Sequence, residues 1–152
     1  MPAAGAVKNI IAIGSGILGG LELGKNMQAA LITRGLREMI QFGEAMGASN
    51  AAFLGTAGIG DLIATATSED SRNYTFGRRM ATGETPEHII KTSGEVIEGV
   101  RTLNIVHQLA IQEKLQLPIV SMLYRAVFEE FPIDRAIRIL MTYNYAPDVD
   151  FL

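Results

Sequence analysis

The first side chain that could do acid–base chemistry is Lys8, which lies in an apolar segment. Its neighbours are Ala6, Val7, Ile10 and Ile11. An amine that loses hydration among apolar side chains gives up its proton more readily, and such a lysine can serve as a general base or acid. The commoner alternative is structural, because a lysine at a helix end can extend its amine to solvent.

Asp61 is a carboxylate in a similar apolar setting, with Ile59 before it and Leu62 and Ile63 after it. A carboxylate taken out of water needs a charged or hydrogen-bonding partner. Thr65 follows one helical turn later and would share its face. The commoner alternative is that Asp61 caps the helix that begins near it.

The run Ser71-Arg72-Asn73 follows a polar turn and stands at the start of a predicted helix. Backbone N–H groups at a helix start attract anions, and an arginine there can bind a phosphate through two parallel hydrogen bonds. The alternative is a surface ion pair between Arg72 and Glu69 or Asp70. Taken singly, none of these candidates predicts a function.

The elements that would position these side chains are predicted to be helices almost throughout. Apolar residues recur at three- and four-residue intervals, and N-caps and prolines mark helix starts. The spacing predicts helices over residues 26–46, 50–54, 71–80, 86–91, 100–114, 118–129 and 132–141. Gly47 and Gly83 are expected to end two of them. Segment 56–67 is ambiguous by periodicity, residues 92–99 are expected to form a loop, and the tail from residue 143 reads as extended or frayed.

The stretch NIIAIGSGILGG contains G-x-G-x-x-G from Gly14 to Gly19, which is typical of a dinucleotide-binding strand and turn. That motif needs a second parallel strand carrying an acid that holds the ribose. The acids at the right distance, Glu38 and Glu44, lie inside a predicted helix instead. The sequence therefore favours a buried helix over residues 6–21, whose glycines allow close helix crossing.

Composition excludes several other classes of protein. The chain has 152 residues, 48% of them hydrophobic and 19% charged, with a formal net charge of −3 and no cysteine. These values predict one folded domain over residues 1–152 without a nucleic-acid-binding stripe or a disulfide framework. The histidines, His88 and His107, are far apart, so no metal site is expected. No segment is long enough to span a membrane, and a cytoplasmic location is expected.

Together, the motifs resemble a known family. GAVKNIIAIGSGILGGLELGKNMQAALITRGLREM, GTAGIGDLIATATSEDSRNYTFG and GEVIEGV occur in this order across nearly the whole chain. They resemble the C-terminal domain of NAD(P)-dependent glycerol-3-phosphate dehydrogenase. The resemblance implies an all-α domain, similar to the C-terminal domain of 6-phosphogluconate dehydrogenase, whose N-terminal Rossmann partner is absent from this chain.

The resemblance also implies a reaction and its residues. The family interconverts sn-glycerol 3-phosphate and dihydroxyacetone phosphate with NAD or NADP, as part of glycerophospholipid and carbohydrate metabolism. By this resemblance, Lys8 is the general base or acid, and Asp61 and Thr65 orient it and the substrate. The implied substrate-binding residues are Lys8, Asp61, Ser71, Arg72 and Asn73, and the implied cofactor contacts are Arg72, Val96 and Glu98.

Two departures limit what the chain should do by itself. Lys25-Asn26 stands where many relatives have Asp-Asn, so any role of that acid is lost. The cofactor domain and its own active-site lysine are expected to be missing, so the isolated chain should be inactive. A homodimer is expected. The alternatives are a non-catalytic helical module that binds an anionic metabolite or a partner protein, and an oligomerisation domain.

Overall fold

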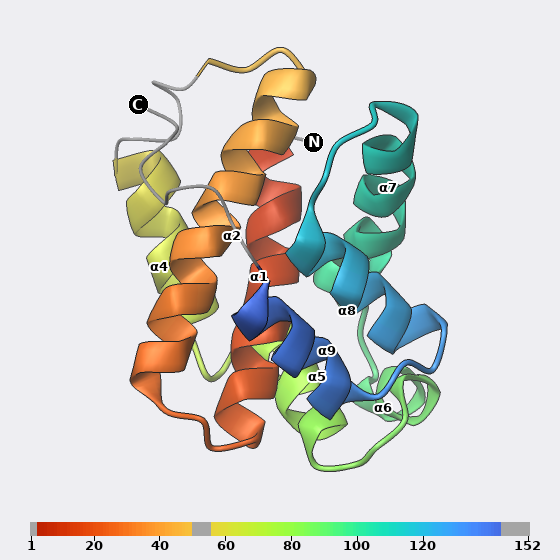
Figure 1. Ribbon diagram of the computed structural model, residues 1–152. Coiled ribbons are helices and arrows are strands. Elements are labelled where there is room, and N and C mark those ends of the chain that lie inside the picture. The colour runs from red at the N-terminus through yellow and green to blue at the C-terminus, as the bar shows by residue number, and fades with distance from the viewer. Residues whose placement is uncertain (1–2, 50–55, 144–152) are drawn as a thin grey trace.

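The computed structural model describes residues 3–49 and 56–143, and every regular element within these ranges is helical. The helices surround a central one, α1 (Figure 1). They are α1 (Ala3–Gly20), α2 (Lys25–Ala45), α4 (Asp61–Ala66), α5 (Arg72–Ala81), α6 (Pro86–Ser93), α7 (Glu98–Gln112), α8 (Pro118–Phe128) and α9 (Ile133–Thr142), with one π-helical turn, η1 (Thr56–Gly60). The predicted all-α fold is confirmed.

Helix α1 is the core of the domain because it is apolar on every side. Ile10, Ile11, Ile13, Ile17 and Leu18 are each exposed by 1% or less. A helix that is hydrophobic all round must be covered all round, and α2, α4, α5, α7 and α8 all contact it. The buried helix predicted for this segment is confirmed, and no strand occurs in the part of the chain that the structure describes.

The glycines of the G-x-G-x-x-G stretch bring α1 against the backbone of α5. A Cβ atom built on Gly16 would lie 2.0 Å from the carbonyl oxygen of Tyr74 on α5. In return, a Cβ atom built on Gly77 of α5 would lie 2.0 Å from the carbonyl oxygen of Ile13. Both distances are far below van der Waals contact, so this crossing exists only because neither position carries a side chain. The interpretation of the glycines as a helix-crossing surface is confirmed.

Most predicted helix ends are confirmed by their caps. Gly47 has a φ of +95° just after α2, and Gly83 has a φ of +103° just after α5. Ser71 caps α5 by accepting a 3.0 Å hydrogen bond from the N–H of Tyr74. Thr85 likewise caps α6. The short helix predicted over residues 50–54 and most of the tail lie outside the described residues.

The loop predicted over residues 92–99 is shorter than expected. Helix α6 continues to Ser93 and ends at Gly94, which takes the left-handed conformation with a φ of +73°. Helix α7 already begins at Glu98. The sequence suggested a later start because Gly99 is a poor helix former, but the N–H of Gly99 in the first turn finds an acceptor on Asn73.

The ambiguous segment 56–67 contains a change of helical geometry. The π-helical turn η1 leads directly into α4, so Gly60 stands at the N-cap position and Asp61 is the first residue of α4. Two helical periods meet within a dozen residues, and neither gives a clear pattern. Single π turns of this kind occur frequently at functional sites.

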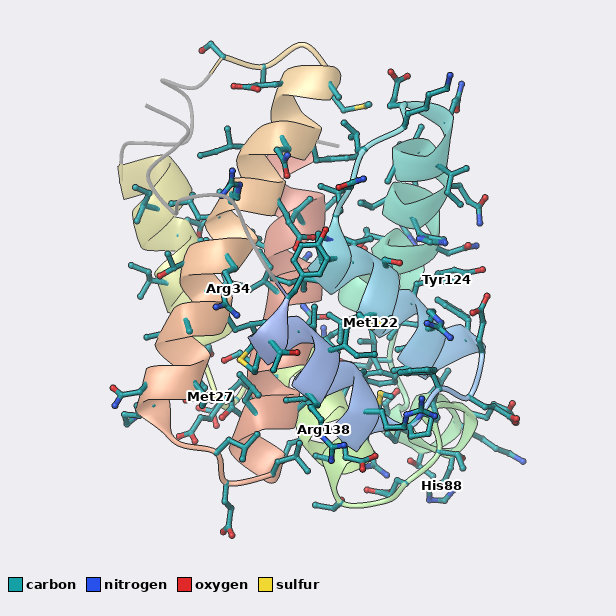
Figure 2. All side chains as sticks on the ribbon, viewed as in Figure 1. Met27, Arg34, His88, Met122, Tyr124 and Arg138 are labelled. Atoms are coloured by element: carbon teal, nitrogen blue, oxygen red, sulfur yellow. The ribbon has the colours of Figure 1, made fainter. Side chains whose placement is uncertain are left out.

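The C-terminal helices close the side of the bundle that faces the viewer in Figure 1. Figure 2 shows Arg34 of α2 beside the upper end of α9, where its Nη1 donates a 3.1 Å hydrogen bond to the carbonyl oxygen of Leu140. Met122 of α8 lies in the region where α8 and α9 meet in the same view, and it is buried. Across the described ranges, no helix is long and apolar enough to cross a membrane.

Candidate active site

An ion pair between the first helix and α4 is the centre of the candidate site. Nζ of Lys8 donates to Oδ2 of Asp61, and the two side chains are 25% and 46% exposed. Lys8 therefore does not simply extend into solvent. Asp61 is not the helix cap either, because Gly60 occupies that position and the Asp61 carboxylate reaches back to α1. The capping alternative for Asp61 is therefore wrong, whereas the Lys8 amine does reach the edge of the bundle, where it meets this carboxylate.

The pair has the chemistry of a proton-transfer site. The Lys8 side chain is only 25% exposed, and its amine meets a carboxylate at the edge of the bundle. The carboxylate fixes the direction of the amine, and the remaining exposure leaves room for a small molecule to reach it. Thr65 lies half-exposed one turn further along α4.

The second part of the site is the start of α5. Arg72 is the first residue of that helix, with 61% of its side chain exposed, and it pairs with Glu95 in the loop before α7. The alternative surface pair of Arg72 with Glu69 or Asp70 is therefore wrong. They precede α5 on the chain, whereas the α6–α7 loop carries its own carboxylate to the guanidinium.

Asn73 joins the start of α5 to the start of α7. The side chain is only 9% exposed, and its Oδ1 accepts a 2.8 Å hydrogen bond from the N–H of Gly99. Buried amide groups need such partners, and this one holds two helix N-termini together. In this structure the Asn73 side chain is buried and holds the starts of α5 and α7 in place, rather than facing solvent.

The loop before α7 carries the implied cofactor contacts. Val96 is 59% exposed, and Glu98 in the first turn of α7 lies 3.8 Å from Arg101. A surface groove of about 460 Å³ runs beside this loop. It is lined by Ile90, Gly94, Glu95, Val96, Ile97, Val100 and Arg101.

The N-terminal half of α1 is the common neighbour of these parts. Oγ1 of Thr102 on α7 lies 3.5 Å from the carbonyl oxygen of Ala6, and a Cβ atom built on Gly99 would lie 2.8 Å from that of Asn9. Lys8 lies between these two contacts on the same helix. The structure thus joins α1 to α4 and α5 to α7 by polar side chains, but no hydrogen bond connects the Lys8–Asp61 pair to the Arg72–Glu95 pair among the described residues.

Sequence reasoning missed Glu38, which was considered only as a ribose-binding acid. Glu38 is 1% exposed, and its Oε2 and Oε1 accept hydrogen bonds of 2.7 Å and 3.2 Å from the N–H groups of Ile119 and Val120. Burial raises its pKa to about 8, although the two backbone hydrogen bonds act in the opposite direction. The signal was present, because Glu38 follows Leu31 and Gly35 on the buried stripe of α2.

Sequence reasoning also missed Glu95. A single acid in a polar loop carries no periodic signal, and its partner Arg72 lies more than twenty positions away along the chain. Only the packing of α5 against the α6–α7 loop brings the two together. No cluster of histidine, aspartate or glutamate that could hold a metal ion occurs within residues 3–49 and 56–143.

Known proteins resemble this chain in sequence and in structure. The family profile described as NAD-dependent glycerol-3-phosphate dehydrogenase C-terminus matches residues 1–138. A glycerol-3-phosphate dehydrogenase [NAD(P)+] from Staphylococcus epidermidis is 49% identical over 137 residues, and one from Staphylococcus haemolyticus is 46% identical. Each match covers 90% of this chain and 41% of the relative. The chain thus spans less than half the length of the relatives it matches.

Two solved structures show the same arrangement of helices. The crystal structure of glycerol-3-phosphate dehydrogenase from Coxiella burnetii superposes with a TM-score of 0.88 at 37% identity, covering 92% of this chain and 43% of that one. The glycerol-3-phosphate dehydrogenase of Saccharomyces cerevisiae gives a TM-score of 0.80 at 29% identity, covering 90% of this chain and 40% of that one.

Proposed function

Because the chain belongs to the family of the NAD-dependent glycerol-3-phosphate dehydrogenase C-terminus, we propose that it forms the catalytic and substrate-binding half of such an enzyme. The reaction is the interconversion of sn-glycerol 3-phosphate and dihydroxyacetone phosphate. An N-terminal Rossmann domain completes the site, and the chain of 152 residues has no turnover when assayed by itself. The enzyme acts as a cytoplasmic homodimer.

Lys8 is the proton-transfer group in this proposal. In the oxidation direction, the Lys8 ammonium first releases a proton to solvent, and the neutral amine then accepts the proton of the substrate hydroxyl while hydride leaves the same carbon. In the reduction direction, it returns that proton to the carbonyl oxygen. The ion pair with Asp61 supports this role, since the carboxylate holds the amine at a fixed point on the edge of the bundle. Thr65, one turn along α4, orients the substrate beside it.

The start of α5 binds the phosphate of the substrate. Ser71, Arg72 and Asn73 supply a helix N-terminus and a guanidinium, a combination that suits a phosphate dianion. Arg72 is exposed and already holds an anionic group, the Glu95 carboxylate. That contact supports the proposal, because it places an oxygen anion on the guanidinium where a phosphate oxygen would bind.

NAD or NADP is the cofactor, and it supplies the hydride acceptor or donor. The residues of this chain that would hold it are Arg72, Val96 and Glu98. They fit the group in character, since the exposed Val96 side chain offers an apolar contact and Glu98 a carboxylate for hydroxyl groups. The groove beside them is open to solvent on the same loop.

The single observation that carries the proposal is the Lys8–Asp61 ion pair at the edge of a helical bundle of this family. The test is a chimera that joins this chain to the N-terminal part of the Staphylococcus epidermidis relative, the part that precedes the matched region. Oxidation of NADH or NADPH is then followed with dihydroxyacetone phosphate as substrate. We expect turnover by the chimera and none by either part alone.

A chimera that folds and binds NADH but shows no turnover would contradict the proposal. Retained binding of inorganic phosphate by such a chimera would favour a non-catalytic module that binds anionic metabolites. Folding is checked by circular dichroism and by cooperative urea unfolding, so that an inactive chimera is not confused with a misfolded one.

A further inference from the structure

The guanidinium proposed to bind the substrate phosphate is paired with a carboxylate of the same chain. We propose that Glu95 is an internal competitor, which occupies the Arg72 guanidinium until a phosphate arrives and then gives up its place to that phosphate. This inference rests on the proposed function, because it takes Arg72 as the phosphate-binding residue. No change of covalent bonds or protons is involved.

The exposure of the pair supports exchange. The side chains of Arg72 and Glu95 are 61% and 59% exposed, so water and dissolved anions reach both partners. Ion pairs this exposed contribute little to stability, and one anion can replace another at small cost. A phosphate dianion carries more charge than a carboxylate and offers three oxygens to the guanidinium, so it wins the competition once it is present.

The backbone around Glu95 is held, so exchange needs only a side-chain movement. Oγ of Ser93 donates a 2.9 Å hydrogen bond to the carbonyl oxygen of Glu95. Ile97 is buried, and the N–H of Gly99 is bonded to Asn73. These contacts fix both ends of the loop while the Glu95 side chain remains at its surface.

Glu95 shares its groove with a second cation. Glu95 and Arg101 both line the groove beside the loop. Arg101 lies 3.8 Å from Glu98, one of the implied cofactor contacts. The groove beside the loop thus holds charged side chains of both signs.

The exchange predicts a specific effect on anion binding. An internal competitor reduces the apparent affinity of every external anion by the same factor, because each must first displace it. Removing the competitor should tighten the binding of inorganic phosphate and of sulfate about two- to fivefold, the range that matches an exposed ion pair. If Glu95 instead helped to build the anion site, its removal would weaken binding.

The test is an NMR titration of the full 152-residue chain with inorganic phosphate and, separately, with sulfate. The signals of the Arg72 guanidinium N–H groups, including Nη2 that contacts Glu95, report the partner of the guanidinium. We expect Glu95→Gln to shift these signals before any anion is added and to tighten both anions by the same factor. Glu69→Gln is the matched control, since it removes an equal charge three residues before Arg72 and should leave affinity unchanged.

Arg72→Gln separates this inference from the proposed function. In that background, Glu95→Gln should have no effect on anion binding, because the shared guanidinium is gone. Equal affinities of wild type and Glu95→Gln, with binding lost in Arg72→Gln, would overturn the exchange and leave the proposed function standing. Unchanged phosphate binding in Arg72→Gln, or no phosphate binding by any variant, would overturn both.

Discussion

The two halves of α1 have different roles. The C-terminal half crosses α5 at backbone distance, through positions that carry no side chain, and solvent is excluded from it. The N-terminal half carries Lys8 to a half-exposed edge, where its amine pairs with Asp61. The first region, which we call the packing region, depends on the absence of side chains at Gly16 of α1 and Gly77 of α5. The second region depends on charged side chains that can change partners. We therefore expect substitutions in the first region to cost stability and substitutions in the second to cost chemistry.

The largest effect is expected at the crossing of α1 and α5. In Gly16→Ala and Gly77→Ala, the new methyl group would have to occupy space within 2.0 Å of a carbonyl oxygen on the facing helix. The helices must then separate along the crossing, which we expect to cost on the order of 4–5 kcal/mol, the range reached by substitutions that disrupt a core. Urea unfolding followed by circular dichroism measures the loss.

Gly5→Ala is the matched control on the same helix. A Cβ atom built on Gly5 meets no heavy atom within 4 Å. Alanine there should stabilise the helix by roughly 0.5–1 kcal/mol, because it restricts the unfolded chain more than glycine does. Equal stability of Gly5→Ala and Gly16→Ala would show that α1 and α5 have room for a side chain at Gly16.

The next largest effect is expected at Lys8, and it should appear in catalysis rather than stability. Lys8→Met keeps the length and apolar character of the stem but removes the proton-transfer group. In the chimera, we expect kcat to fall by about 10²–10⁴-fold, the usual contribution of a general acid or base. The urea midpoint should change little, because Asp61 is 46% exposed and stays hydrated without its partner.

Lys25→Met provides the comparison for Lys8→Met. Lys25 is an exposed first residue of α2, so its loss changes the net charge equally without touching Asp61. An unchanged kcat in Lys8→Met would exclude Lys8 as the proton-transfer group. A large drop in the urea midpoint of Lys8→Met would instead show that the Lys8–Asp61 ion pair stabilises the fold.

The sequence predicted the packing region more completely than the site. Apolar periodicity, the Ser71 and Thr85 caps and the terminal glycines depend on neighbours along the chain, so their helices were placed correctly to within a few residues. The helix-crossing role of the glycines also followed, once no second strand could be found. By contrast, the junction of η1 and α4 mixes two helical periods, and no local pattern describes it.

The partners of the charged residues could not be read from the sequence. Lys8 and Asp61 were candidates in their own right, but only tertiary packing brings positions 8 and 61 together. The only partners that the sequence offered for Arg72 were the acids next to it, as an alternative to phosphate binding, yet the α6–α7 loop supplies Glu95. Glu38 was missed as a structural residue because the two hydrogen-bond donors that it accepts from, the N–H groups of Ile119 and Val120 at the start of α8, lie about eighty positions away.

Glu38 combines features of both regions, because its side chain can carry a charge but is buried among packed helices. Its pKa is raised from 4.5 to about 8, so the folded protein holds a proton that the unfolded chain releases. The contribution of Glu38 to stability should be greatest below about pH 4.5 and should fall as the pH rises to about 8, by up to about 1.4 kcal/mol per pH unit within that window. Urea unfolding at pH 6 and pH 7 measures this slope.

Glu38→Gln should remove most of that dependence on pH. The amide has the same shape and still offers an oxygen to the N-terminus of α8, but it does not titrate. Its stability should therefore differ little between pH 6 and pH 7. If the unfolding free energies of wild type and Glu38→Gln change equally between pH 6 and pH 7, the Glu38 carboxyl group does not cause the pH dependence.

The smallest effect is expected at an ion pair that belongs to neither region. Glu84 accepts hydrogen bonds of 2.8 Å and 2.6 Å from Nε and Nη2 of Arg79, and these lower the pKa of Glu84. A lowered pKa gives a contribution that is present above the ordinary pKa of glutamate and disappears as the pH falls. Glu84→Gln should therefore reduce the urea midpoint slightly at pH 7 and by less as the pH falls below 4.5, and it should leave phosphate binding unchanged. Glu87→Gln, three residues later and exposed, is the control for charge alone. A loss of phosphate affinity in Glu84→Gln would mean that the charged site extends along α5 beyond its first turn, and the separation of the two regions would fail there.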